Sequence, residues 1–366
     1  MLNSTSCNEQ WRTRPADERY TSLTELAAAM QSAMAHSSAK VVPSKSLSAE
    51  VDGGKLVVRR NGNTAEPTNW AFGQLCSRVT VPAGYMRDIR PVELVADCIN
   101  EGIMRRDVED LGLLLYRADT DSPTYLTAVT GPNYGRIWNA RLADAMVESF
   151  GDGRTGRIKI PGEFGKQVPI TKENTTLYAS DRDMVCFLAD ESRSLEVKNR
   201  RDGKTGNLSH GIAIGNSDVG GGTLWLARFI FDFFCANRII WGLEQVEELR
   251  IRHTVSAPHR FLSEVVPILR QFAASDVTLK QAQITAAQEK RIADLDEFLL
   301  KRKFTRSQVS GIKAAFETDE GTKLLDDCSV WDSVVAATAY ARRLQYQDQR
   351  VAIEREAGRM LLTASA

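Results

Sequence analysis

The stretch LSHGIAIGNSDVGGGTLWLARFIFDFFCANRIIWG, residues 208–242, decides the fold. It begins with an apolar run of strand length, breaks at a polar turn and continues through three consecutive glycines into an aromatic-rich segment. Glycine reaches positive φ cheaply and lets another backbone approach closely, and buried polar groups must find partners. We therefore predict the packed centre of the fold here, with positive φ or a close backbone contact at one or more of the three glycines. The residues assigned to this structural turn are Asn216, Ser217, Asp218, Gly220, Gly221, Gly222 and Asn237.

The composition is that of an ordinary globular protein. The chain has 366 residues with 47 basic and 47 acidic side chains, so any nucleic-acid surface must be a local patch. Its six cysteines form no CxxC pair, and residues 1–15 lack the apolar core of a secretion signal, which favours a reducing cytoplasm. The apolar stretch 224–243 is interrupted by Arg228, Asp232 and Arg238, which argues against a membrane span.

Turn signals between apolar runs predict an α+β fold. We expect a central, mostly antiparallel sheet with a long β-hairpin, centred on residues 110–255, together with packed helices. The chain divides into a flexible N-terminal segment (1–50), an α+β core (51–258) and a helical C-terminal region (259–366). Within the first segment, residues 37–48 are rich in Ser, Lys and Pro and are predicted to form a linker.

Few sequence patterns indicate catalysis. The chain has no GxxxxGK[ST] loop, no HExxH and no GxSxG turn. His253 and His259 lie close together without further clustered ligands, so we predict no metal site, and we also predict no cofactor. The acidic residues between 181 and 191 leave a two-metal nuclease open as an alternative. These acidic residues are Asp181, Asp183, Asp190 and Glu191.

A group of basic residues stands between two predicted strands. An arm of this kind, at the tip of a hairpin, can follow a phosphate backbone. The alternative is a solvated turn that protects a sheet edge from aggregation. The residues of this basic arm are Lys198, Arg200, Arg201 and Lys204.

A second basic group, Arg250, Arg252 and His253, lies on a predicted strand, where the two arginines share one face. The alternative for this group is a pair of surface salt bridges with Glu247 and Glu248. Aromatic rings that could stack on bases, or else pack in the core, are Trp70, Tyr85, Tyr134 and Trp138. The predicted nucleic-acid site comprises the basic arm, this second group, Arg136 and Tyr134.

Five motifs occur in a fixed order: GPNYGRIWN (131–139), the 208–224 segment, FCANRIIWG (234–242), WDSVVAATAYARR (331–343) and REAGRML (355–361). Together they resemble the phage- and plasmid-type proteins grouped as the domain of unknown function 932 family. The chain departs from that pattern at Arg238, where glycine is usual, and at Ala336, where asparagine is usual. The resemblance implies a role in the DNA metabolism of a mobile element.

The predicted layout is also similar, by analogy, to that of single-strand annealing recombinases of the RecT and Redβ kind, which are rings or filaments that hold single-stranded DNA. We therefore expect a non-enzymatic, homo-oligomeric protein that binds and anneals single-stranded DNA in recombination or replication. Part of the Phe229–Phe234 segment, or the C-terminal helices, is expected to pack against another subunit. The alternatives are a metal-dependent nuclease or nucleotidyl transferase, and a structural or anti-defence protein that binds another protein.

Overall fold

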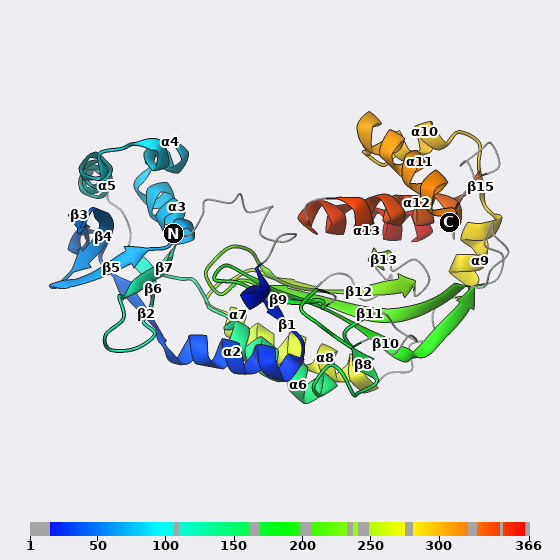
Figure 1. Ribbon diagram of the computed structural model, residues 1–366, viewed down its shortest axis with the longest axis horizontal. Coiled ribbons are helices and arrows are strands. Elements are labelled where there is room, and N and C mark those ends of the chain that lie inside the picture. The colour runs from blue at the N-terminus through cyan, green and yellow to red at the C-terminus, as the bar shows by residue number, and fades with distance from the viewer. Residues whose placement is uncertain are drawn as a thin grey trace.

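The computed structural model describes residues 15–105, 110–161, 169–173, 175–197, 206–232, 237–240, 249–274, 281–320, 328–344 and 347–362. Its elements confirm the α+β class, the mostly antiparallel pairing, the long hairpin and the helical C-terminal region. In Figure 1 one group of strands and helices lies at one end of the long axis and the C-terminal helices lie at the other, with a large sheet between and below them.

The small sheet has six strands in the order β2-β6-β7-β5-β4-β3. All its pairs are antiparallel except β5 with β7. Its strands are β2 (Ser37–Val42), β3 (Ser48–Asp52), β4 (Lys55–Arg60), β5 (Asn63–Pro67), β6 (Leu111–Tyr116) and β7 (Tyr125–Thr130), and the short helix η2 is Ser44–Ser46. Helices α3 (Asn69–Val79), α4 (Ala83–Asp88) and α5 (Val92–Arg105) lie between β5 and β6 in the chain. They share one buried apolar cluster with this sheet.

The large sheet contains the long hairpin of β10 and β11. Its strands are β1 (Arg19–Tyr20), β8 (Ile158–Lys159), β9 (Leu177–Ala179), β10 (Met184–Val197), β11 (Gly206–Asn216), β12 (Leu224–Asp232), β13 (Asn237–Ile240) and β14 (Leu249–Ile251). Alternate residues of β10 point to opposite faces, so that Met184, Cys186 and Leu188 join one apolar cluster while Val185 and Phe187 join another. Burial on both faces explains why the first part of this strand, residues 184–189, is a continuous apolar run.

Helices cover the two faces of the large sheet. The first face packs on α2, α6, α7, η3 and α8, and Figure 1 shows α12 and α13 on the opposite side. The helices of the first face, with η1, are η1 (Ala16–Glu18), α2 (Leu23–Ala35), α6 (Asn139–Phe150), α7 (Ala257–Arg260), η3 (Phe261–Val265) and α8 (Val266–Ala274). The remaining elements are α9 (Gln281–Glu289), β15 (Arg291–Ile292), α10 (Leu295–Lys301), α11 (Arg306–Glu320), β16 (Cys328–Ser329), α12 (Val330–Arg343) and α13 (Gln347–Leu362).

The N-terminal segment (1–50), predicted to be flexible, contains helices and strands from residue 16 onward. Residues 37–48, predicted to be a linker, form β2 and η2 and begin β3, because β2 pairs along its whole length with β6. Earlier in the same segment, α2 buries Leu23 and Leu26 completely against the large sheet. Residues 1–14 lie outside the described part of the chain.

Two further expectations need correction. The hairpin of β6 and β7 belongs to the small sheet, because it pairs with β2 and β5, so the strands of residues 110–255 do not form one sheet. Helices α7 and α8 open the predicted C-terminal helical region, yet Phe261, Val265 and Leu269 are buried in the core of the large sheet. Among the described helices, none is both long and apolar enough to cross a membrane.

Candidate functional site

Two of the sequence motifs meet at the start of α6, through contacts between residues that are 79 positions apart in the chain. The Asn216 side-chain amide donates to the Ile137 carbonyl and to Asn139 Oδ1, both at 2.8 Å. The Asp218 carboxylate accepts from the Asn139 backbone N–H at 3.2 Å. Since Trp138 at the N-cap makes no side-chain capping bond, Asp218 supplies the acceptor that α6 lacks locally. We call residues 134–139, residues 216–222 and His253 the motif junction.

Rings and a guanidinium fill the centre of the motif junction. Tyr134 and His253 stack with ring centroids 4.8 Å apart and an interplanar angle of 19°. The Arg136 guanidinium lies over the rings of both Tyr134 and Trp138, at 5.2 and 5.5 Å from their centroids. The Tyr134 hydroxyl donates to the Ser217 carbonyl at 2.9 Å, and Arg136 donates to the Asp218 carbonyl. These side chains therefore make their contacts within the protein.

Burial dominates the electrostatics of this cluster. It raises the pKa of the Tyr134 hydroxyl and of the Asp218 carboxyl, and it lowers the pKa of Arg136 and of His253. Each shift disfavours the charged form, as expected for groups withdrawn from water. These side chains bond and stack with one another, so the cluster has a structural role at the motif junction. The nucleic-acid contacts expected of Tyr134, Arg136 and His253 remain predictions.

The turn at residues 216–222 also connects the large sheet to the small one through hydrogen bonds. The Val219 carbonyl accepts from Trp70 Nε1 at 3.2 Å and from Gln74 Nε2 at 2.8 Å, and Gln74 Oε1 accepts from the Val129 N–H at 2.8 Å. Gly220 has a φ of 85°, which confirms the backbone conformation predicted for at least one of the three glycines. Trp70 thus has an interior role, whereas Tyr85 is 66% exposed.

The second predicted basic group lies on the large sheet. Arg250 and Arg252 are exposed on either side of buried Ile251, in and just after the edge strand β14, which pairs with β12. The β10–β11 hairpin is paired as far as Val197 and Gly206. The basic arm, Lys198, Arg200, Arg201 and Lys204, lies outside the described residues, and so does the side chain of Asn237.

Two acidic residues of the alternative nuclease site have other partners. Asp190 is buried and pairs with Arg157 at 3.2 Å, and Asp183 accepts from the Ser180 hydroxyl at 3.2 Å. The side chain of Glu191 lies outside the described part. Within the described residues, no group of three or more His, Cys, Asp or Glu side chains is placed to hold a metal ion.

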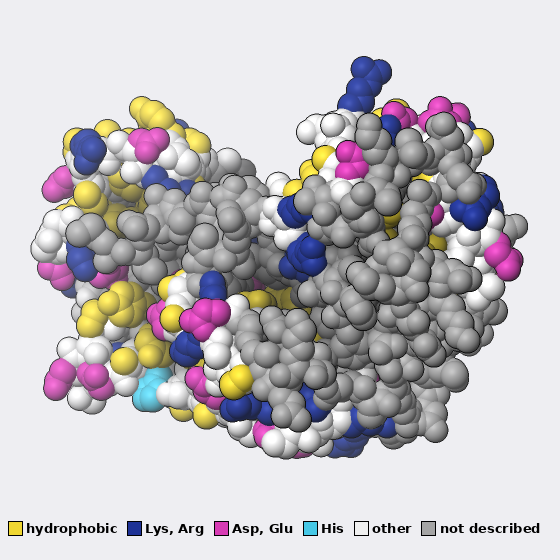
Figure 2. Space-filling model, turned by 45° about the vertical axis from the view of Figure 1, so that its right-hand side comes forward, with side chains coloured by type: hydrophobic (Ala, Val, Ile, Leu, Met, Phe, Trp, Pro, Cys, Tyr) yellow, Lys and Arg dark blue, Asp and Glu magenta, His cyan; other side chains and the backbone are white. Residues whose placement is uncertain are grey.

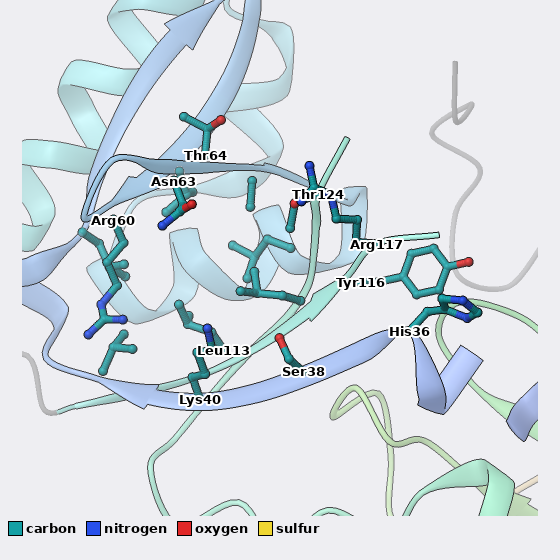
Figure 3. Close-up of a pocket in the computed structure, with 16 residues that line it drawn as sticks. His36, Ser38, Lys40, Arg60, Asn63, Thr64, Leu113, Tyr116, Arg117 and Thr124 are labelled. Carbon is teal, nitrogen blue, oxygen red and sulfur yellow. The ribbon is translucent and has the colours of Figure 1, made fainter. Parts of the chain in front are cut away.

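A pocket on the small sheet was not predicted from the sequence. It has a volume of about 280 Å³ and is lined by residues of β2, β4, β5, β6 and β7 (Figure 3). Three strands separate β2 from β4 in the hydrogen-bonding order, so only a curved sheet can line one cavity with both. Paired residues share a face of the sheet, and the pairs Lys40–Leu113 and Arg60–Asn63 both face this pocket.

The pocket has an apolar floor and a basic rim. Leu113, Leu115 and Val58 are among the floor residues, and none of the sixteen lining residues is acidic. The basic residues of the rim are His36, Lys40, Arg60 and Arg117.

Basic residues of the rim differ from the neighbouring basic residues of β4 in whether they form ion pairs. On β4, outside the lining, Lys55 and Arg59 pair with Glu66 and Glu50 at 3.0 and 2.5 Å. In contrast, neither Lys40 nor Arg60 forms an ion pair within the described part of the chain. Figure 2 shows basic and acidic side chains interspersed over the visible described surface, so the pocket is a local concentration of positive charge.

Comparisons with known proteins found no match for this chain. No family model matches the chain, and no match was found among curated proteins or among solved structures. The resemblance to the domain of unknown function 932 family therefore stays an expectation based on the five motifs.

Proposed function

We propose that this protein binds single-stranded DNA and anneals strands as a cytoplasmic homo-oligomer of a phage or plasmid, without catalysing a reaction. The observation that carries the proposal is the pocket on the small sheet, which combines a basic rim free of carboxylates with an apolar floor. Single-stranded nucleic acid offers phosphates to such a rim and unpaired base faces to such a floor. The exposed Arg250 and Arg252 add positive charge on the large sheet.

Removing the Lys40 and Arg60 cations of the rim tests the proposal. We expect Lys40→Gln/Arg60→Gln to weaken binding of a fluorescein-labelled oligothymidylate about tenfold, because the two side chains together neutralise a backbone phosphate. The slope of log affinity against log salt should flatten by roughly 0.7, the value expected for one phosphate that is no longer neutralised. Fluorescence anisotropy over a salt series, without added metal, measures both quantities.

A matched control removes the same charge elsewhere. Arg90 and Arg141 are exposed and lie outside the pocket, so Arg90→Gln/Arg141→Gln should leave the salt slope close to that of the wild type. Equal loss of affinity in the two double variants would mean that only net charge matters. Turnover of the oligonucleotide that depends on added Mg²⁺ would favour the nuclease alternative, and no binding at low salt would favour a protein-binding role.

The basic arm gives a second, independent prediction. Replacement of Lys198, Arg200, Arg201 and Lys204 by alanine should weaken binding about equally for every single-stranded sequence, because phosphate contacts carry no base information. The free energy of unfolding should change by only a few tenths of a kcal/mol, as is usual for exposed charges. Anisotropy with oligonucleotides of several sequences checks the first point and urea unfolding the second. A folded variant with an unchanged salt slope would remove the arm from the proposal.

A further inference from the structure

The pocket on the small sheet has room for one nucleotide of a strand rather than for several. Its volume of about 280 Å³ lies just below the range of roughly 300–1,000 Å³ that is usual for ligand pockets. A single nucleotide is a ligand of this class, whereas several stacked nucleotides would need an extended channel.

The two ends of the pocket differ in chemistry. Figure 3 shows Arg60 at one end and Tyr116 with His36 at the other. Arg60 Nε donates to the Ser46 hydroxyl at 3.2 Å, which fixes the guanidinium at its end of the cavity. Lys40, on the facing strand β2, adds a second positive charge to the same rim. A phosphate group is the natural partner of a fixed guanidinium and a nearby ammonium.

The positive charge of Arg117, beside the aromatic end, is partly compensated by a neighbouring carboxylate. Its Nε donates to the Ser122 carbonyl at 3.0 Å. The pKa of the neighbouring Asp119 is lowered, mainly by hydrogen bonds from Ser122 and Asp121 and also by the positive charge of Arg117. A carboxylate close enough to sense this charge competes with any phosphate for it. The phosphate is therefore better placed at Lys40 and Arg60.

The aromatic end offers a surface for a base. The Tyr116 ring is half-buried and packs edge-to-face with His36, with centroids 6.4 Å apart and an interplanar angle of 69°. This contact restricts the ring while part of its surface lines the pocket. Stacking on such a ring tolerates every base, because every base has a π-face.

We propose that this pocket binds one nucleotide monophosphate unit, with its phosphate at Lys40 and Arg60 and its base against Tyr116. The inference rests on the proposed function, since it names the unit of the strand that this site would hold. The same chemistry is present in a free nucleotide and in one nucleotide of a DNA strand, so the two sources must be distinguished by experiment.

Calorimetric titrations of the full chain with dTMP, thymidine and inorganic phosphate test the proposal. We expect dTMP to bind more tightly than either thymidine or phosphate, and oligothymidylate to compete with it. The variant Tyr116→Leu should weaken dTMP binding about tenfold, whereas Tyr116→Phe should stay within about twofold of the wild type because it keeps the stacking ring. The variant Lys40→Gln/Arg60→Gln should weaken dTMP binding but leave thymidine binding unchanged.

Several outcomes separate this inference from the function on which it rests. Equal dTMP affinity in the wild type and in a folded Tyr116→Leu, or phosphate binding as tightly as dTMP, would overturn the placement of the base. Salt-sensitive oligothymidylate binding without any dTMP binding would overturn the nucleotide site and leave the DNA-binding proposal standing. Tight dTMP binding that oligothymidylate cannot displace would support the site with a free nucleotide as its ligand and would count against DNA binding. Thermal melts of each variant, followed by circular dichroism, show whether the variant is folded.

Discussion

Replacing Gly135 with alanine is expected to lower the free energy of unfolding by about 3 kcal/mol, because the new methyl group would overlap the backbone of another segment. A Cβ at this position would lie 1.8 Å from the Thr254 carbonyl oxygen and 2.7 Å from its carbon. The approach is fixed from both sides, since the Gly135 N–H donates to the His253 carbonyl at 3.1 Å and His253 Nδ1 lies 3.1 Å from the Gly135 carbonyl oxygen. Urea unfolding followed by circular dichroism gives the change.

Alanine variants at two other glycines serve as controls for the size of this effect. Gly222 has no neighbour within 4 Å of an added Cβ and no positive φ, so Gly222→Ala should change stability by no more than about 0.5 kcal/mol. Gly220→Ala should lower the free energy of unfolding by about 1 kcal/mol, because alanine tolerates a φ of 85° poorly. A Gly135→Ala variant with the unfolding midpoint of the wild type would show that the 131–139 segment does not approach Thr254 as closely as described.

Elements with strong local signals could be predicted from the sequence. The glycine and asparagine turns around β4 bound a short apolar run, and prolines mark the first turns of α4 and α5. The β10–β11 hairpin follows from two apolar runs around a polar, basic connection. The sequence predicts a linker in place of β2 because four of the six residues of this strand are exposed, and its order comes from pairing with β6, about 70 residues further along the chain.

The sites show the same division between local and long-range information. The turn at 216–222 is predictable from its glycines, yet its role as the cap of α6 depends on Asn139, which carries no signal of its own. The pocket could not be predicted because Lys40 and Arg60, taken singly, are ordinary surface residues on separate strands. The one available signal was alternation: Ser38, Lys40 and Val42 share a face of β2, as Val58 and Arg60 do on β4. Only the curvature of the sheet brings these faces together.

Substituting Asp218 by alanine is expected to lower the free energy of unfolding by about 2 kcal/mol. Roughly half of this decrease comes from the missing N-cap of α6. The rest comes from Arg136, which would lose a nearby negative charge while staying half-buried. Asp218→Asn should have about half of this effect, because an amide oxygen can still accept from the Asn139 N–H whereas the negative charge near Arg136 is lost.

The pH dependence of the Asp218→Asn comparison has a definite sign. Burial raises the pKa of the Asp218 carboxyl in the folded protein above its unfolded value of about 3.9. The stability that this group contributes is therefore present below the unfolded pKa and is lost as the pH rises through the folded pKa. The asparagine does not titrate, so the difference in the free energy of unfolding should shift in favour of Asp218→Asn as the pH rises from about 4. Urea unfolding of both proteins over a pH series measures this difference. A constant difference, or one that shifts in favour of the wild type, would mean that the fold stabilises the Asp218 carboxylate rather than its protonated form.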